Sequence, residues 1–147
     1  MKGMLVSMLA AACVAMGIAG CGGSALPEAP ACVPAAATRT AETLNGQVGQ
    51  YLNEVFAGED ELATLLADFR AEYPEGRFYR SSAFREDWVA YSGAAGCEID
   101  RMSALSAPAQ ASPTLRNSDL QLEAILAEYR NQLNAGTEAV GRITWRA

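Results

Sequence analysis

Side chains that could carry chemistry are few in this chain of 147 residues, and the missing types exclude whole classes of reaction. There is no histidine, and Lys2 is the only lysine. These absences exclude serine or cysteine nucleophiles activated by histidine, histidine-ligated metals and Schiff-base lysines. The sequence also lacks a phosphate-binding loop and a nucleotide-binding fingerprint. We therefore expect no metal and no cofactor.

Carboxylates remain as candidates for catalysis. Glycan cleavage needs only two acids that flank the scissile bond. The candidate pairs are Glu86 with Asp87, and Glu98 with Asp100. Strings of charged residues usually face water, so we favour a solvated helix surface for both pairs. We expect a protein that is not an enzyme. The alternative is a small carboxylate-dependent peptidoglycan or glycan hydrolase, or a glycan binder.

The N-terminal residues have the organisation of an export signal. Lys2 supplies a positive charge, residues 4–19 are uncharged and mostly apolar, and small residues follow. The segment Ile18-Ala19-Gly20-Cys21 resembles the lipobox of bacterial lipoprotein precursors. The resemblance covers only this N-terminal region. It implies a signal peptide at residues 1–20, diacylglycerol on the Cys21 sulfur, and usually a fatty acyl group such as palmitate on the new amino terminus.

Two other interpretations of this segment stay open. The first is an uncleaved membrane anchor, although the apolar run is shorter than the roughly 20 residues that span a bilayer. The second is an ordinary signal peptide that is cut near Ala25. If Cys21 is lipidated, its acyl chains attach the protein to a membrane. Gly22 follows Cys21 in place of the Asp associated with inner-membrane retention in some enteric-type bacteria. We therefore expect a cell-envelope protein and, if the cell has two membranes, one on the outer membrane that faces the periplasm.

The other cysteines predict a disulfide. Cys13 would leave with the signal peptide and Cys21 would carry lipid, so Cys32 and Cys97 remain as an even pair in an oxidising compartment. Neither belongs to a Cys-x-x-Cys redox motif, which favours a structural bridge. Such a bridge would stabilise the fold by roughly 4 kcal/mol. The alternative is two unpaired thiols.

The charge balance excludes one class of partner. The chain has 11 Lys plus Arg against 17 Asp plus Glu, a net charge of −6, and losing Lys2 with a signal peptide makes it more acidic. An acidic protein has no long-range attraction for nucleic acid or for anionic headgroups. We expect no nucleic-acid partner.

One segment concentrates arginine and aromatic residues, which are enriched at protein-binding hot spots. We take Arg77, Tyr79, Arg80 and Arg85 as candidates for binding a partner protein. The neighbouring aromatic residues step by four and three along the chain, and this spacing favours burial in the core over exposure. They are Phe84, Trp88 and Tyr91.

The elements that would position these residues are helices. A tether rich in Gly, Ala and Pro covers residues 21–38, and a helical domain covers residues 39–147. Apolar residues recur every three to four positions, which predicts an all-α fold, a small antiparallel bundle of about four helices. The expected helices are residues 40–57, residues 59–73, a segment from Ser81 or Ser82 to about Leu105, and a segment that starts at Ser118.

Glycines set the expected breaks. Gly58 would end the first helix in a left-handed cap, so that the first two helices form an antiparallel hairpin. The third segment is expected to be one helix, kinked near Gly96, and the alternative is two short helices. The fourth helix either ends near Gly136 or continues toward Trp145.

These observations favour a non-enzymatic envelope lipoprotein that acts as an accessory or binding subunit. Its membrane attachment would be the lipid on Cys21, and its partner another envelope protein.

Overall fold

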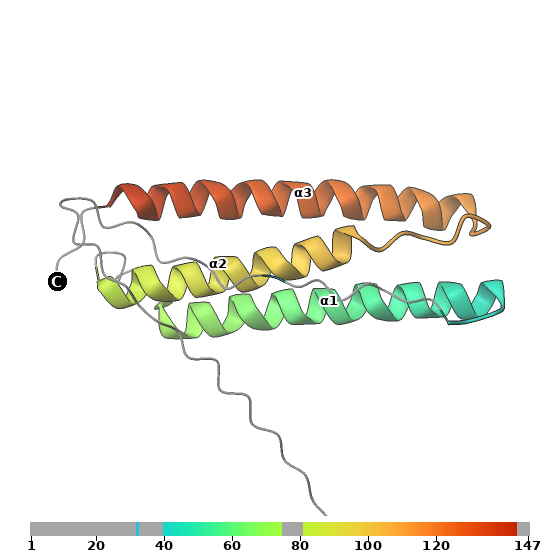
Figure 1. Cartoon of the computed structure of the whole chain (residues 1–147), viewed down its shortest axis with the longest axis horizontal. Helices are drawn as coiled ribbons and strands as arrows, with labels where there is room; N and C mark the ends of the chain where they lie inside the picture. Colours follow the sequence, from blue (N-terminus) through green and yellow to red (C-terminus); the bar gives the residue numbers. More distant parts are fainter. Residues whose placement is uncertain (1–31, 33–39, 75–80, 144–147) are drawn as a thin grey trace, which may run out of the picture.

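The structure is a computed structural model that describes residues 32, 40–74 and 81–143, and this part of the chain is helical (Figure 1). It contains three α-helices, α1 (Leu44–Glu72), α2 (Ser82–Ser103) and α3 (Pro113–Arg142). The predicted all-α class is confirmed. The predicted signal peptide, and all of the predicted tether except Cys32, lie outside the described residues.

Helix α1 corrects the prediction of two helices separated at Gly58. It begins after Thr43, whose side chain accepts a hydrogen bond from the Gly46 backbone N–H at 3.2 Å, and it continues through Gly58. The buried positions Tyr51, Val55, Gly58 and Leu62 step by four, three and four. Gly58 therefore belongs to one uninterrupted apolar stripe. It is buried inside the helix, where the sequence had predicted that the helix would end.

Helix α2 is a single helix, as the first of the two alternatives for this segment predicted. Ser81 caps it by accepting a hydrogen bond from the Phe84 backbone N–H at 3.1 Å. The helix passes Gly93 and Gly96 without a break and ends at Ser103. Ser81 was one of the two predicted caps, because a serine oxygen satisfies a backbone N–H that has no partner in the first turn.

Helix α3 begins earlier than predicted. Its cap is Ser112, which accepts from the Leu115 backbone N–H at 3.2 Å, and Ser118 lies inside the helix. Pro113 occupies the first turn, where its missing N–H has no intrahelical partner to lose. The helix also passes Gly136 and ends at Arg142. Gly136 leaves room for the ring of Trp88, which a side chain at this position would overlap.

Helix α2 packs against α1 on one side and α3 on the other. Figure 1 shows the end of α1 beside the start of α2, and the start of α2 beside the end of α3. The shared core is formed by buried residues of all three helices and of the linker between α2 and α3, residues 104–112. Its members are Tyr51, Val55, Leu62, Tyr91, Ala95, Ile99, Met102, Leu105, Leu126 and Leu133.

Asp119 on α3 joins three parts of the fold. One of its carboxylate oxygens accepts a hydrogen bond from the Tyr51 hydroxyl at 2.6 Å, and the other accepts a hydrogen bond from the backbone N–H of Ala107 at 2.9 Å. These bonds connect α3 to α1 and to the linker.

Within the described ranges, no helix combines the length and the apolar character needed to cross a membrane.

Candidate functional site

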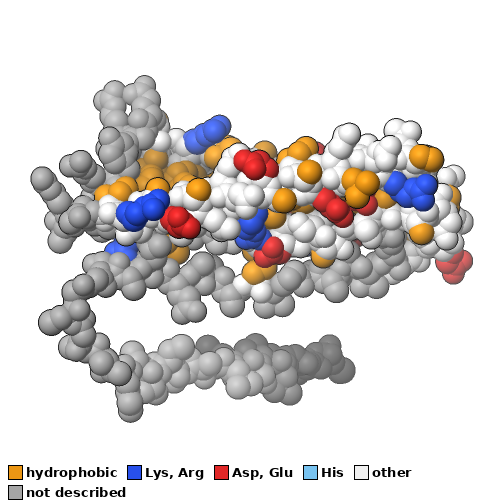
Figure 2. All heavy atoms as spheres, turned by 90° about the horizontal axis from the view of Figure 1, so that it is seen from above, with side chains coloured by type: hydrophobic (Ala, Val, Ile, Leu, Met, Phe, Trp, Pro, Cys, Tyr) orange, Lys and Arg blue, Asp and Glu red, His pale blue; other side chains and the backbone are white. Residues whose placement is uncertain are grey.

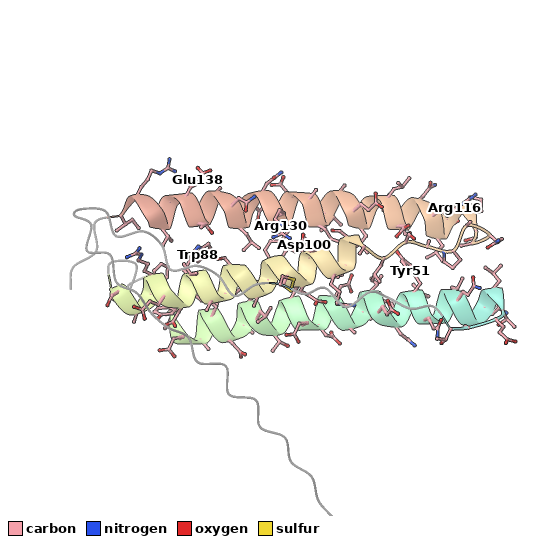
Figure 3. All side chains as sticks on the ribbon, viewed as in Figure 1. Tyr51, Trp88, Asp100, Arg116, Arg130 and Glu138 are labelled. Atoms are coloured by element: carbon pink, nitrogen blue, oxygen red, sulfur yellow. A yellow bond between two sulfur atoms is a disulfide. The ribbon has the colours of Figure 1, made fainter. Side chains whose placement is uncertain are left out.

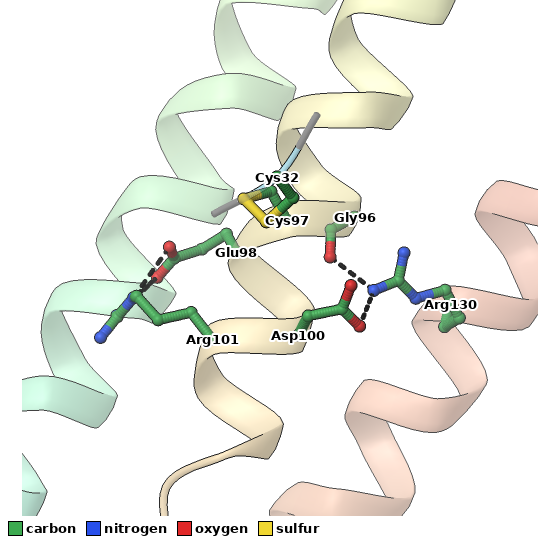
Figure 4. Close-up of a disulfide and its surroundings, with 7 residues drawn as sticks. All are labelled: Cys32, Gly96, Cys97, Glu98, Asp100, Arg101 and Arg130. Atoms are coloured by element: carbon green, nitrogen blue, oxygen red, sulfur yellow. Dashed lines mark hydrogen bonds and ion pairs between the residues drawn. A yellow bond between two sulfur atoms is a disulfide. The ribbon is translucent and has the colours of Figure 1, made fainter. Parts of the chain in front are cut away.

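A disulfide connects the N-terminal part of the chain to the second half of α2. Cys32 and Cys97 are bonded, with their Cα atoms 5.3 Å apart (Figure 4). This separation lies within the range that a disulfide spans without backbone distortion. The predicted pairing is therefore present in the structure, and it fixes the position of Cys32 against the helical domain.

Two ion pairs flank this disulfide, and they separate the two acids of one candidate carboxylate pair, Glu98 and Asp100. Glu98 accepts hydrogen bonds from Arg101, at 2.5 Å from Nη2, and Arg101 also donates to the Glu54 carbonyl of α1 at 3.3 Å. The bond with Glu98 is the main cause that raises the pKa of Arg101. On the other side of α2, Asp100 pairs with Arg130.

Arg130 also donates to the backbone carbonyl of Gly96 at 2.5 Å. Figure 4 shows Glu98 directed toward α1 and Asp100 directed toward α3. Because the two carboxylates diverge and each binds an arginine, they do not flank a common substrate position. The second pair, Glu86 and Asp87, lies on the exposed surface of α2.

The aromatic residues of α2 belong to the core, as their spacing predicted. Phe84 and Tyr91 are buried, and Trp88 is half-buried and packs against the core cluster. Trp88 points toward α3 (Figure 3), where its indole N–H donates to the Thr137 hydroxyl at 3.2 Å. The Tyr91 hydroxyl shares a hydrogen bond of 2.7 Å with the hydroxyl of Tyr129. Burial is the main reason that the pKa of Tyr91 is raised.

A groove of about 490 Å³ lies between α1 and α2 near the aromatic residues. We call it the acidic groove. Each helix contributes four residues spaced by three, one and three positions, which places them on one helix face. The lining residues are Leu65, Asp68, Phe69 and Glu72 of α1, Asp87, Ala90, Tyr91 and Ala94 of α2, and Tyr73 after α1.

The acidic groove has apolar walls and three exposed carboxylates, Asp68, Glu72 and Asp87. The Tyr73 hydroxyl donates a hydrogen bond to Asp87. Burial, followed by this bond, raises the pKa of Tyr73 to about 12. Asp87 is thus held beside an aromatic ring. The volume falls within the range of about 300–1,000 Å³ that is typical of ligand pockets.

The site residues predicted from the sequence lie partly inside and partly outside the described part of the chain. Cys21, Arg77, Tyr79 and Arg80 lie outside the described residues, and their predicted roles stay predictions. Arg85 is half-buried in the first turn of α2. Among the residues that the structure describes, no group of three or more Cys, Asp or Glu side chains is arranged to hold a metal.

Sequence reasoning named two residues of the groove in other roles, Asp87 as a carboxylate beside Glu86 and Tyr91 as a core aromatic, and it missed the others. The sequence did contain a signal. Two acids alternate with two apolar residues on one face of α1, and their spacing of three, one and three positions is the same as that of the groove residues of α2. The α1 residues are Leu65, Asp68, Phe69 and Glu72. Pairing this face with the corresponding face of α2 required knowledge of how the helices pack.

Comparison with protein-family models, curated proteins and solved structures found no match to this chain.

Proposed function

We propose that this protein is an envelope lipoprotein, anchored through lipid on Cys21, and that its helical domain serves as a non-enzymatic accessory or binding subunit. The observation that carries the proposal is the disulfide between Cys32 and Cys97. It fits an exported protein, since disulfides persist in oxidising compartments. The same disulfide attaches Cys32 of the predicted tether to α2 and so shortens the free part of the tether. We call this attachment the clip.

The clip sets the reach of the lipid. A chain spans at most about 3.6 Å per residue, so the segment from Cys21 to Cys32 can extend roughly 40 Å. Without the disulfide, the free segment would run from Cys21 to the start of α1 near Leu44, and its maximal reach would roughly double. The domain would therefore work close to the surface of its membrane, on our proposal the outer membrane on its periplasmic side.

The packing supports a binding role for the domain. We infer an antiparallel bundle, because the aromatic rings at the end of α1 contact those at the start of α2, as in the pair Phe69 and Phe84 at 5.7 Å. The inferred bundle would present long helix faces to a partner. Arg77, Tyr79, Arg80 and Arg85 remain candidates for contact with an envelope protein.

Fractionation of cells that express the full chain tests the anchor. The wild-type protein should remain in the membrane pellet after a carbonate wash, and mass spectrometry of its N-terminal peptide should show acyl groups on Cys21. The Cys21→Ser variant should appear in the soluble fraction with unchanged helical circular dichroism. Retention of Cys21→Ser in the washed membranes would overturn the proposal.

A matched control uses the other cysteines. Cys32→Ser combined with Cys97→Ser removes the clip and leaves the lipid attachment, so this variant should stay in the membrane pellet. Crosslinking in cells with the wild-type protein should then recover one reproducible envelope partner. Repeated recovery of none would count against the role of a binding subunit.

A further inference from the structure

We propose that the acidic groove binds a short basic amphipathic helix of a partner protein. This inference rests on the proposed role as a binding subunit, and it supplies the kind of partner. A helix that places its apolar face in a groove between two helices is a common mode of peptide recognition. The shape, the apolar walls and the charge of the groove each constrain the occupant.

The shape of the groove suits a helix. Ala90 and Ala94 are two of the four α2 residues that line the groove, and their small side chains leave space between the two helices. The α1 wall runs from Leu65 to Glu72, a length of about 10 Å or two helical turns. A segment of two turns offers apolar side chains at positions i and i+3 or i+4, which would point into the groove together.

The apolar part of the groove would hold these side chains. The rings of Phe69 and Tyr91 are stacked with their centroids 4.8 Å apart, and Leu65 lies beside Phe69 on the same face of α1. Aromatic side chains provide a large contact area, and they lose little conformational entropy on binding because they have few rotatable bonds.

The charge of the groove selects a basic occupant. Asp68, Glu72 and Asp87 surround the apolar walls, and no arginine is among the lining residues. The nearby Arg70 lines an adjoining depression between α1, α2 and α3, which shares Phe69 and Tyr91 with the acidic groove. By contrast, the face seen in Figure 2 carries acidic and basic side chains interspersed with hydrophobic ones. Complementary charge directs association and excludes acidic partners.

The probe for this proposal is a synthetic amphipathic peptide of Leu and Lys, about 14 residues long so that it can form a helix. Fluorescence anisotropy of the labelled peptide would be followed during titration with the full chain carrying Cys21→Ser. We expect saturable binding with one peptide per chain, weakened by added salt. The same peptide with Glu in place of Lys should not bind.

Two variants that lose the same number of charges separate the groove from general attraction to an acidic protein. Asp68→Asn, Glu72→Gln and Asp87→Asn, combined, should weaken binding by about tenfold or more. The matched control neutralises three exposed acids of α3, Glu123, Glu128 and Glu138, with Gln, and should stay within about threefold of the parent chain. Equal loss in both variants would overturn the proposal.

A third variant tests the shape at constant charge. Ala90→Gln places a longer side chain in the groove at an exposed helix position, and it should weaken binding by about tenfold. Unchanged affinity, or no binding of the Leu/Lys peptide to the parent chain, would show that the groove is not the site. The titration needs only a folded chain, so its outcome is independent of the membrane fractionation that tests the anchor.

Discussion

Gly58 of α1 lies directly against Met102 of α2. A Cβ atom added to Gly58 would lie 2.6 Å from both Cγ and Sδ of Met102, and 2.8 Å from a carboxylate oxygen of Glu98. Met102 is only 2% exposed, and Arg101 holds Glu98, so neither side chain can move away without a cost. The close approach of α1 and α2 therefore depends on a missing side chain.

Gly58→Ala should destabilise the protein although alanine favours helix. The gain in helix propensity is about 1 kcal/mol, and overpacking a core costs about 1–3 kcal/mol. We expect a net loss of about 1 kcal/mol in the free energy of unfolding, measured by urea denaturation followed by circular dichroism.

Gly49→Ala in the same helix is the matched control, because nothing lies within 4 Å of its added Cβ. It should stabilise the protein by up to about 1 kcal/mol. If both substitutions stabilise the protein to the same extent, the packing of Gly58 is not the reason that α1 remains unbroken.

Tyr51→Phe should remove a hydrogen bond that links α1 to α3. Its hydroxyl donates to the carboxylate of Asp119 at 2.6 Å, and Tyr51 is only 4% exposed. A hydrogen bond to a charged group contributes about 1.5–3 kcal/mol, so the free energy of unfolding should fall by about 2 kcal/mol. Tyr129→Phe is the comparison, because Tyr129 bonds to the neutral hydroxyl of Tyr91.

The Tyr129→Phe variant should lose only about 1 kcal/mol, the usual contribution of a neutral hydrogen bond. Urea denaturation of both variants at neutral pH gives the two values. A larger loss for Tyr129→Phe than for Tyr51→Phe would contradict the role assigned to Asp119.

Removal of the disulfide should lower stability more than either substitution. The bond joins residues separated by 65 positions, and the chain-entropy model gives about 4 kcal/mol for a loop of this length. Cys32→Ser combined with Cys97→Ser should therefore unfold at a clearly lower denaturant concentration than the oxidised wild type. A reductant should shift the wild type to the same midpoint and leave the variant unchanged. Equal midpoints for oxidised wild type and variant would show that the bond adds no stability.

Alkaline pH should weaken the fold through two tyrosines whose pKa is raised in the folded state, Tyr73 and Tyr91. Burial raises the pKa of Tyr91, and burial together with Asp87 raises the pKa of Tyr73 from 10.0 to about 12. The folded state thus keeps these protons more tightly than the unfolded state. Their stabilising contribution is complete below the unfolded pKa and is lost as the pH rises through the folded pKa.

We therefore expect the free energy of unfolding to decrease between about pH 10 and pH 12, with a shallower decrease for Tyr91→Phe. Urea denaturation across this range provides the slopes, and the ultraviolet absorbance of tyrosinate reports the titration itself. Identical slopes for wild type and Tyr91→Phe would rule out a contribution from Tyr91.

The sequence alone predicted those features that depend on neighbours along the chain. Apolar residues every three to four positions indicated helices and placed Phe84 and Tyr91 in the core, because side chains at this spacing share one helix face. The capping preference of serine identified Ser81 as one of two starts for α2. The pairing of Cys32 with Cys97 followed from the proposed fates of the other two cysteines.

Only the tertiary structure decided the features that depend on contacts between helices. Gly58 in isolation is a helix breaker, yet its burial against Met102 keeps α1 continuous. Glu98 and Asp100 are two residues apart in the sequence, but they pair with arginines on opposite sides of α2. The acidic groove likewise exists only where one face of α1 meets one face of α2. Such contacts depend on the relative rotation and approach of whole helices, and the periodicity of a single helix does not contain that information.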